Sequence, residues 1–418
     1  MFLFLYTRDA MIRIREIQPA PCADCGGAPL HHRLEWTSAL LDTVITPVLD
    51  PVGRFGMKRI PRLSGALENT VPSLLRLFEK IGLGDITYAY DDRDFKFVTM
   101  CLWDEANRRN IRLWQFRPFG MVKHLFVAQY GDETVVYERT PVAKGASRGI
   151  SWIDDKRIVK KKLQKQGMPV SRGSACLTES QALAVFSALR KPVIVKPHQG
   201  SGTRHTTLHI TDKEEMLRAF RIARRLSPLV MVEEELRGSV YRPTVVDGKL
   251  VATIRRDPPF ITGDGTHSIA ELVAKENEHP KRSGPVFSPI EITDTVLKEL
   301  ERQHCSPASI PQKDQKVFLH QKVNWGVGGH TTDVTDDVHP DNRTLFEEIA
   351  RVTRAPILGI DFIIEDISRS WKEQELCGVI ECNSMPFFDT HHLPFHGQPR
   401  DVAGAIWDMV FPASKQSA

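Results

Sequence analysis

The sequence predicts a protein of mixed helices and strands, with an α/β region over residues 1–150 and α+β structure beyond it. Three observations lead to this prediction. Apolar residues recur at helical spacing in residues 69–82, and short runs rich in β-branched residues, such as residues 193–197, indicate strands. Asp247-Gly248 between two such runs indicates a β-hairpin. With 418 residues, the chain can bury a large core and form two or three domains.

Composition limits the expected partners. The formal charge of +4 is small for this length, so nucleic acid is not expected, and Lys160-Lys161-Lys162 is interpreted as a solvated helix face. No apolar run reaches the length of a membrane span, and the apolar start of the chain is too short and lacks the basic region of a signal peptide. Seven irregularly spaced cysteines indicate a reducing, cytoplasmic environment. A homo-oligomer is compatible with this composition.

The first 150 residues give few functional signals. Residues 69–82 are predicted as a helix that Gly82 ends, and a second helix over 98–110 is followed by a strand over 111–116. This succession suggests an open sheet, but no phosphate-binding glycine fingerprint accompanies it. Cys22 and Cys25, with His31 and His32 after them, could form half of a zinc site. The second half is missing from the neighbouring sequence, so metal binding is the less favoured interpretation.

From residue 154 onward the pattern is clearer. Helices are predicted at 156–166 and 180–190, a strand at 193–197, and an amide-rich glycine loop at 199–203. Thr211 and Glu214 predict a capping box that opens the next helix. A strand over 229–232 reaches Glu233, and the predicted hairpin follows over 240–254.

Three charged residues in this part have an open interpretation. Lys196 ends an apolar strand directly before the glycine loop, so it could hold a phosphate or could be a lysine at the rim of a sheet. In either case its replacement is not expected to disturb the core. Lys156 could be a second phosphate ligand or a surface lysine, and Glu233 could accept a hydrogen bond from an adenine amino group.

Two strands near the C-terminal end carry the strongest chemical signal. Asp361 lies in the apolar run 359–364, and Glu381 and Asn383 lie on one face of the run 378–383 because they are two residues apart. If the strands are antiparallel neighbours, Asp361 joins the other two. A buried carboxylate without a partner is costly, so three oxygen ligands within apolar runs favour a site for Mg²⁺.

The order of these elements carries a family resemblance. It rests on the segments named above and on Arg242, Arg255-Arg256, Gly263-Asp264-Gly265-Thr266-His267, Asn324, Gly328-Gly329 and Asp333-Val334-Thr335. In order and spacing, residues 150–412 resemble the ATP-grasp superfamily, most of all the ATP-grasp domains of cyanophycin synthetase and bifunctional glutathione synthetase. The resemblance implies two α+β subdomains that clasp ATP, at residues 151–235 and 236–412, after an N-terminal domain of unknown role at 1–150.

The resemblance also implies a role for each matched residue. The ATP site would consist of two lysines, a glycine loop and a strand-end glutamate: Lys156, Lys196, Gly200, Ser201, Gly202 and Glu233. Two Mg²⁺ ions, with Mn²⁺ as an alternative, would bind Asp361, Glu381 and Asn383. The γ-phosphate or an acyl phosphate would be steadied by Arg242 and Arg256. The acceptor substrate would bind at Asn324, Gly328 and Gly329.

The implied activity is that of an ADP-forming ligase, which joins a carboxylate to an amine through an acyl phosphate on an amino acid or peptide. Two alternatives stay open: a ligase that modifies a ribosomal peptide, and a catalytically inactive module that binds ATP or peptide. Val240 stands where the family often has an acidic residue near the ribose, and His320 replaces a common arginine. The printed sequence has no room for the second catalytic domain of cyanophycin synthetase, so a polymerase with two reactions is not expected.

Overall fold

The computed structural model describes residues 22–25, 31–41, 61–90, 97–119, 125–143, 151–198, 204–321, 323 and 327–417. Contacts within the chain divide it into two compact units. Unit 1 comprises residues 1–50 and 172–235, and unit 2 comprises residues 51–171 and 236–418. Among the described residues, no helix has the length and apolar character needed to span a membrane.

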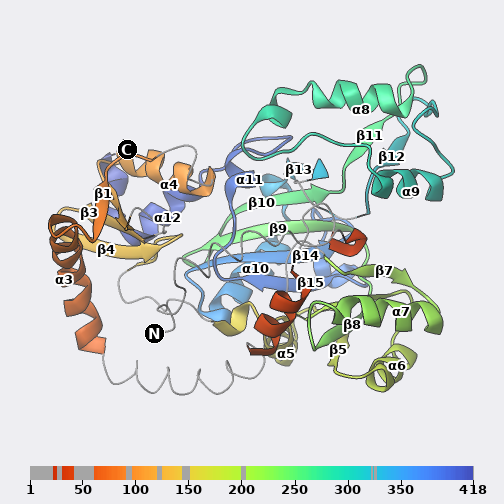
Figure 1. The fold of residues 1–418 in the computed structure, drawn as a ribbon, viewed down its shortest axis with the longest axis horizontal. Coiled ribbons are helices and arrows are strands. Elements are labelled where there is room, and N and C mark those ends of the chain that lie inside the picture. Colours follow the sequence, from red (N-terminus) through yellow and green to blue (C-terminus); the bar gives the residue numbers. More distant parts are fainter. Residues whose placement is uncertain are drawn as a thin grey trace. The chain divides into compact units, whose positions relative to one another are not determined.

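Unit 1 contains a four-stranded antiparallel sheet in the order β5-β8-β6-β7 (Figure 1). The strands are β5 (Gly173–Cys176), β6 (Val193–Pro197), β7 (Thr207–Ile210) and β8 (Val230–Glu234). Helices α6 (Glu179–Ala188) and α7 (Lys213–Arg224) share one buried core with alternate strand residues such as Val195 and Val232. Since strand side chains alternate, Lys196 and Glu233 belong to the opposite face.

The start of α7 differs from the prediction by one residue. Asp212, not Thr211, is the N-cap, and its side chain accepts a hydrogen bond from the backbone N–H of Glu215. An aspartate satisfies the first free N–H groups of a helix as well as a threonine does, so the local sequence allowed both registers.

The largest sheet belongs to unit 2 and has the antiparallel order β13-β10-β9-β14-β15 (Figure 1). Its strands are β9 (Ser239–Val246), β10 (Lys249–Asp257), β13 (His330–Asp333), β14 (Ile357–Ile364) and β15 (Gly378–Asn383). The predicted hairpin is confirmed between β9 and β10, where Asp247 and Gly248 have φ of 48° and 74°. Positive φ at both central residues is typical of tight hairpins.

Helices cover both faces of this sheet. On one face, α5 (Lys156–Lys165) and α10 (Pro340–Thr353) share a core with Leu358, Ile360 and Phe362 of β14. On the other, β14 residue Ile357 joins a core formed with α4 (Phe97–Arg108) and α12 (Val402–Val410), and the short helix α11 (Asp389–His392) packs on β10 and α4. Side chains alternate along β14, so Asp361 belongs to this second face.

Two smaller sheets complete unit 2. The first is a meander of β1 (Gly84–Thr87), β2 (Arg112–Pro118), β3 (Leu125–Tyr130) and β4 (Glu133–Glu138), against which α3 (Pro61–Lys80) packs. The second pairs β11 (Phe260–Thr262) with β12 (Lys316–Phe318) and shares its own core with α8 (Ile269–Asn277) and α9 (Asp294–Arg302).

Candidate active site

The two C-terminal strands that the sequence singled out are antiparallel neighbours. Asp361 of β14 lies directly opposite Glu381 of β15, and Asn383 lies opposite Gly359. Side chains of directly paired residues project from the same face of a sheet, so the two carboxylates and the amide share one face. Cys382 projects from the other face into the core that Ile360 and Phe362 occupy. The parity argued from the sequence is therefore present in the structure.

Two arginines hold Asp361. Arg242 on the adjacent strand β9 donates from Nε and from Nη2 to the two carboxylate oxygens of Asp361, with 2.8 Å between Nη2 and Oδ2. Arg256 on β10 donates from Nη1 to Oδ1 at 3.4 Å. All three side chains are largely buried. Burial alone would lower the pKa of Arg242, but the adjacent Asp361 carboxylate raises it above its ordinary value. Asp361 therefore neutralises charge that would otherwise be buried without a partner.

Lys156 performs a similar function for Glu381. It is the first residue of α5, whose N-cap Asp155 accepts hydrogen bonds from the backbone N–H groups of Arg157 and Ile158. The Lys156 ammonium lies 3.1 Å from Oε2 of Glu381. Burial raises the pKa of Glu381, but the positive charges of Lys156 and Arg242 hold this pKa below its ordinary value. Glu381 is therefore a carboxylate, not a carboxylic acid, at neutral pH.

Asn383, Asp389 and His391 complete the surroundings of this cluster. Nδ2 of Asn383 is shielded from solvent and has no hydrogen-bond partner among the described residues. Burial raises the pKa of Asp389, although Arg242 and Arg256 act in the opposite direction. His391 is fully buried, its Nε2 lies 2.8 Å from Oγ1 of Thr244, and burial lowers its pKa to about 3. His391 is therefore neutral at physiological pH.

The residues of this cluster fit hard divalent cations. Asp361, Glu381 and Asn383 offer only oxygen ligands, which Mg²⁺ prefers. Each carboxylate oxygen has more than one acceptor position, so an arginine on Asp361 does not exclude a metal ion there. The amide of Asn383 is a buried polar group whose hydrogen-bonding capacity is incompletely used by the described residues.

In unit 1, Lys196 and Glu233 are partners of each other. Lys196 of β6 pairs with Met231 of β8, which places Glu233 diagonally across and on the same face. The ammonium of Lys196 lies 2.9 Å from Oε2 of Glu233. The Glu233 side chain is 1% exposed and that of Lys196 is 11% exposed, so the pair is shielded from solvent. The two residues that the sequence assigned to phosphate and adenine therefore occupy one location.

The structure describes only some of the remaining predicted residues. Gly200, Ser201, Gly202 and Asn324 lie outside the described residues. Gly328 has φ of 91°, and a Cβ atom there would lie 2.4 Å from Cγ1 of Ile290. Its carbonyl oxygen accepts a hydrogen bond from Arg282. Gly328 therefore has a packing role whether or not a substrate binds, and Gly329 is buried beside it.

The segment around Asp264 forms a local turn. Asp264 Oδ1 accepts hydrogen bonds from the backbone N–H groups of Thr266 and His267, which holds the pKa of Asp264 below its ordinary value. Ser268 and Glu271 then form a reciprocal capping box at the start of α8. These contacts satisfy the polar groups of the turn without a ligand.

The sequence reasoning missed Asp389 and the use of Arg242 and Arg256 to hold Asp361. Asp389 follows Phe387-Phe388 and precedes His391-His392, a polar run between apolar residues just beyond β15. The sequence favours histidines of a substrate pocket or of the surface here, and the structure buries His391. His391, His392 and His396 do not form a metal cluster with one another in the described part of the chain.

Comparisons with known proteins show what the whole chain is similar to. Residues 155–240 match the family model described as the carbamoyl-phosphate synthase L chain, ATP binding domain. The chain is 32% identical over 388 residues to cyanophycin synthetase of Synechocystis sp., covering 91% of this chain and 44% of that protein. It is 32% identical over 274 residues to the glutathione biosynthesis bifunctional protein GshAB of Mannheimia succiniciproducens, covering 62% of this chain and 35% of that protein.

A solved structure is also similar. The bifunctional glutathione synthetase of Pasteurella multocida superposes with a TM-score of 0.60 at 28% sequence identity, covering 78% of this chain and 45% of that chain. The chain thus spans less than half the length of each of these relatives.

Proposed function

The chain belongs to the ATP-grasp superfamily, and from this premise we propose that it is an ADP-forming ligase that joins a carboxylate to an amine. The observation that carries the proposal is the buried cluster on β9, β10, β14 and β15, where Asp361 and Glu381 face each other and each is held by a basic side chain. Asp361 is buried and Glu381 is half-buried beside it. A buried carboxylate needs a reason, because replacing it with an apolar residue would avoid a large desolvation cost.

In this proposal Asp361, Glu381 and Asn383 hold Mg²⁺, as two ions, with Mn²⁺ as an alternative. When bound, the metal would neutralise charge on the ATP phosphates and on the transferring phosphoryl group. Lys156 keeps Glu381 ionised, and ionised carboxylates are the form that binds a hard cation. The short distance between Lys156 and Glu381 supports a further role for this lysine beside a phosphate.

Arg242 and Arg256 would steady the γ-phosphate and the acyl phosphate that forms from it. A carboxylate is a poor electrophile at neutral pH, and transfer of the γ-phosphoryl group to it creates a good leaving group. Both arginine side chains are largely buried, so their interaction with the developing negative charge would be stronger than in water. A bidentate arginine also fixes the orientation of the groups that it contacts.

For unit 1 we propose the nucleotide contacts. Lys196 would contact a phosphate and Glu233 the adenine amino group, with Gly200, Ser201 and Gly202 as further phosphate contacts. The support is the match of residues 155–240 to an ATP binding domain, which includes both charged residues. In this proposal the Lys196 ammonium leaves Glu233 and contacts a phosphate when ATP binds. A lysine is suited to this change because its ammonium is a point charge with three donors on a flexible stem.

The substrate is proposed to be an amino acid or a peptide, with its acceptor side at Asn324, Gly328 and Gly329. This rests on the names of the relatives, which act in cyanophycin and glutathione synthesis. Because the chain spans less than half of each relative, the particular carboxylate and amine are not carried over.

The test is product analysis with a panel of amino acids and dipeptides, Mg²⁺, ATP and hydroxylamine as a general amine. Hydroxylamine converts an activated carboxylate to a hydroxamate, so it reports activation without knowledge of the natural amine. Hydroxamate with ADP and phosphate supports the proposal, whereas hydroxamate with AMP and pyrophosphate refutes it and indicates adenylation. Nucleotide binding by calorimetry, with no hydroxamate from any carboxylate, favours the inactive binding module. Lys156→Ala should reduce hydroxamate formation, and Lys165→Ala on the exposed side of α5 serves as its control.

A further inference from the structure

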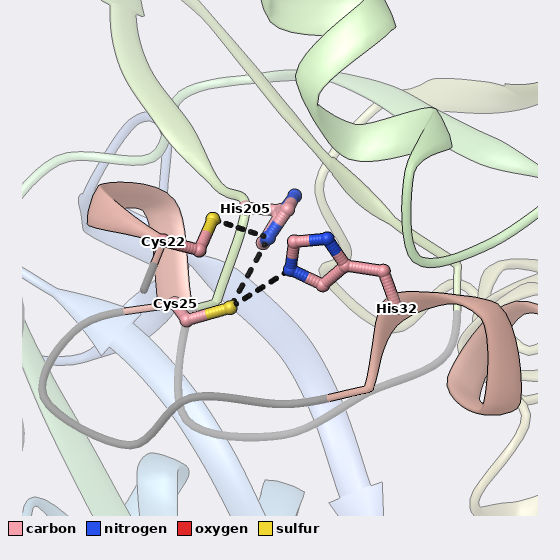
Figure 2. A group of neighbouring side chains, drawn as sticks. All are labelled: Cys22, Cys25, His32 and His205. Carbon is pink, nitrogen blue, oxygen red and sulfur yellow. Dashed lines mark hydrogen bonds between the residues drawn. The ribbon is translucent and has the colours of Figure 1, made fainter. Parts of the chain in front are cut away.

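Four potential metal ligands meet in unit 1, and none of them belongs to the residues of the proposed ATP and Mg²⁺ sites. Cys22 and Cys25 lie together with His32 and His205, and one ligand atom from each lies within 4.8 Å of all the others (Figure 2). Among the described residues this is the only such group of cysteine, histidine or acidic side chains. The missing half of the site at Cys22 and Cys25 is therefore supplied in part by His205, which lies 180 positions beyond Cys25.

The distances fit tetrahedral zinc coordination. Zinc–sulfur bonds of about 2.3 Å and zinc–nitrogen bonds of about 2.0 Å give edges of roughly 3.3–3.8 Å between ligands of a tetrahedron. Nε2 of His205 lies 3.6 Å from Sγ of Cys22 and 3.4 Å from Sγ of Cys25, and Nε2 of His32 lies 3.1 Å from Sγ of Cys25. These three distances are close to the expected edges, and a small inward movement brings all four atoms within bonding distance of one ion.

The orientation of His205 adds an independent observation. Its Nδ1 lies 2.8 Å from the carbonyl oxygen of Ile222, and a carbonyl can only accept a hydrogen bond. The proton is therefore on Nδ1, and Nε2 directs a lone pair towards both sulfur atoms. Histidines that bind metals are commonly oriented by such a bond from the other ring nitrogen to a backbone carbonyl. The His205 side chain is almost completely buried, so this lone pair is not available to bulk solvent.

Contacts of Asp24 also hold the cysteine turn next to His205. The N–H of His205 donates to the carbonyl oxygen of Asp24, between the two cysteines, at 2.9 Å. Arg225, just beyond α7, lies 3.4 Å from the Asp24 carboxylate. His205 adopts φ of 52°, a left-handed conformation that is uncommon outside glycine. Contacts from Asp24, Ile222 and Arg225 thus bring the cysteine turn and His205 together.

We propose that Cys22, Cys25, His32 and His205 bind one Zn²⁺ ion in a closed, structural site. Two sulfur and two nitrogen ligands in tetrahedral geometry favour zinc over hard cations such as Mg²⁺, and four protein ligands leave no open position for catalysis. Binding requires both thiols to lose their protons to solvent, with no change in oxidation state. The ion would tie the N-terminal segment to His205, two residues before β7.

Zinc binding is tested on the purified full-length chain. Elemental analysis should find one zinc ion per chain, and the protein stripped of metal should bind Co²⁺ with the intense visible absorption of tetrahedral cobalt and a sulfur-to-metal charge-transfer band. The Co²⁺ spectrum needs no variant, so it tests the proposal even if substitutions prevent folding. Neither measurement uses ATP, so the zinc site and the proposed ligase activity fail separately.

Variants then identify the ligands. Cys22→Ser, Cys25→Ser, His32→Gln and His205→Gln should each lose most of the zinc, whereas His31→Gln, at the position next to His32, and Cys305→Ser should keep it. His205→Cys should restore zinc and shift the charge-transfer band, because it replaces a nitrogen ligand with sulfur. A wild-type chain with neither zinc nor tetrahedral Co²⁺ spectrum would overturn the proposal. A disulfide between Cys22 and Cys25, found by mass spectrometry in protein purified under reducing conditions, would also overturn it.

Discussion

The buried ion pairs Lys196–Glu233 and Arg242–Asp361 differ in geometry. In unit 1, Lys196 contacts Glu233 through a single ammonium group. In unit 2, Arg242 binds both oxygens of Asp361, and Arg256 adds a third contact. A planar guanidinium that binds two oxygens fixes its partner in one orientation, whereas an ammonium can rotate to another acceptor. The difference indicates that the arginine cluster is a rigid support and that the lysine pair can exchange its partner for a ligand.

The largest expected effect follows from removal of Asp361. Asp361→Ala removes the carboxylate that Arg242 and Arg256 both contact, and we expect a loss of about 3–5 kcal/mol in the free energy of unfolding. Ligase activity should be lost as well. Urea denaturation measures the first effect. Glu348→Ala, which removes an exposed pair with Arg351 on α10, should leave stability unchanged. Equal, small effects of both substitutions would show that the arginine cluster does not depend on Asp361.

The second prediction separates binding from stability in the lysine pair. The position of Lys196 at a strand end suggested that its replacement would spare the fold, but the pairing with buried Glu233 changes this expectation. Lys196→Met should cost about 2–3 kcal/mol, because it leaves a buried carboxylate without its ammonium. Adding Glu233→Gln should restore most of this stability. It should not restore ADP affinity, measured by calorimetry. Recovery of both would mean that Lys196 has only a structural role.

The third prediction concerns pH and Lys156. The pKa of Glu381 is lowered in the folded chain, so its contribution to stability is complete at neutral pH. This contribution is lost as the pH falls below the ordinary carboxyl range of about 4 to 5. Lys156→Ala raises the folded pKa of Glu381 towards its ordinary value, so the melting temperature of the variant should fall less than that of the wild type as the pH falls through this range. Because Glu381 is 29% exposed, the effect at pH 7 should be below about 1 kcal/mol. Identical pH profiles for Lys156→Ala and Lys165→Ala would contradict the coupling.

The smallest expected effect concerns the acceptor side. Gly329→Ala should raise the KM for the carboxylate substrate several-fold and change the KM for ATP little. Gly328 is unsuitable for this test, because a Cβ atom there would contact Ile290 and confound binding with stability. An equal rise in both KM values, or no rise, would show that this segment does not bind the acceptor.

Local signals in the sequence predicted much of the fold and part of the site. Asp247-Gly248 predicted the hairpin because positive φ is compatible with only a few residue types. The alternation around Glu381 and Asn383 predicted a shared face because strand periodicity is fixed by the backbone. The cysteine–histidine cluster could not be predicted in the same way. His205 and Cys25 meet only in the folded chain, and no spacing rule relates residues so far apart in sequence.

The partners of the charged side chains could not be predicted from the sequence either. The sequence placed Arg242 and Asp361 on β-strands but did not show that β9 and β14 are neighbours. Neighbouring strands determine which charges neutralise each other, and therefore whether a carboxylate is available or already held. The pairing of Lys196 with Glu233 was missed for the same reason, since it depends on the β6–β8 register.

The segment from β11 to His330 is expected to open before the large sheet does. Its helices α8 and α9 and the paired strands β11 and β12 enclose their own core. The fully buried Arg282 donates hydrogen bonds to Glu276 and to the carbonyl oxygen of Gly328, and its Nη2 lies 2.8 Å from Nε2 of His330. Regions with a separate core tend to open as cooperative units before the whole protein unfolds. Amide hydrogens of α8 should therefore exchange with solvent together with those around Gly328, and earlier than those of β14. An opening of this kind would expose the proposed acceptor residues while the carboxylates of the large sheet stay protected.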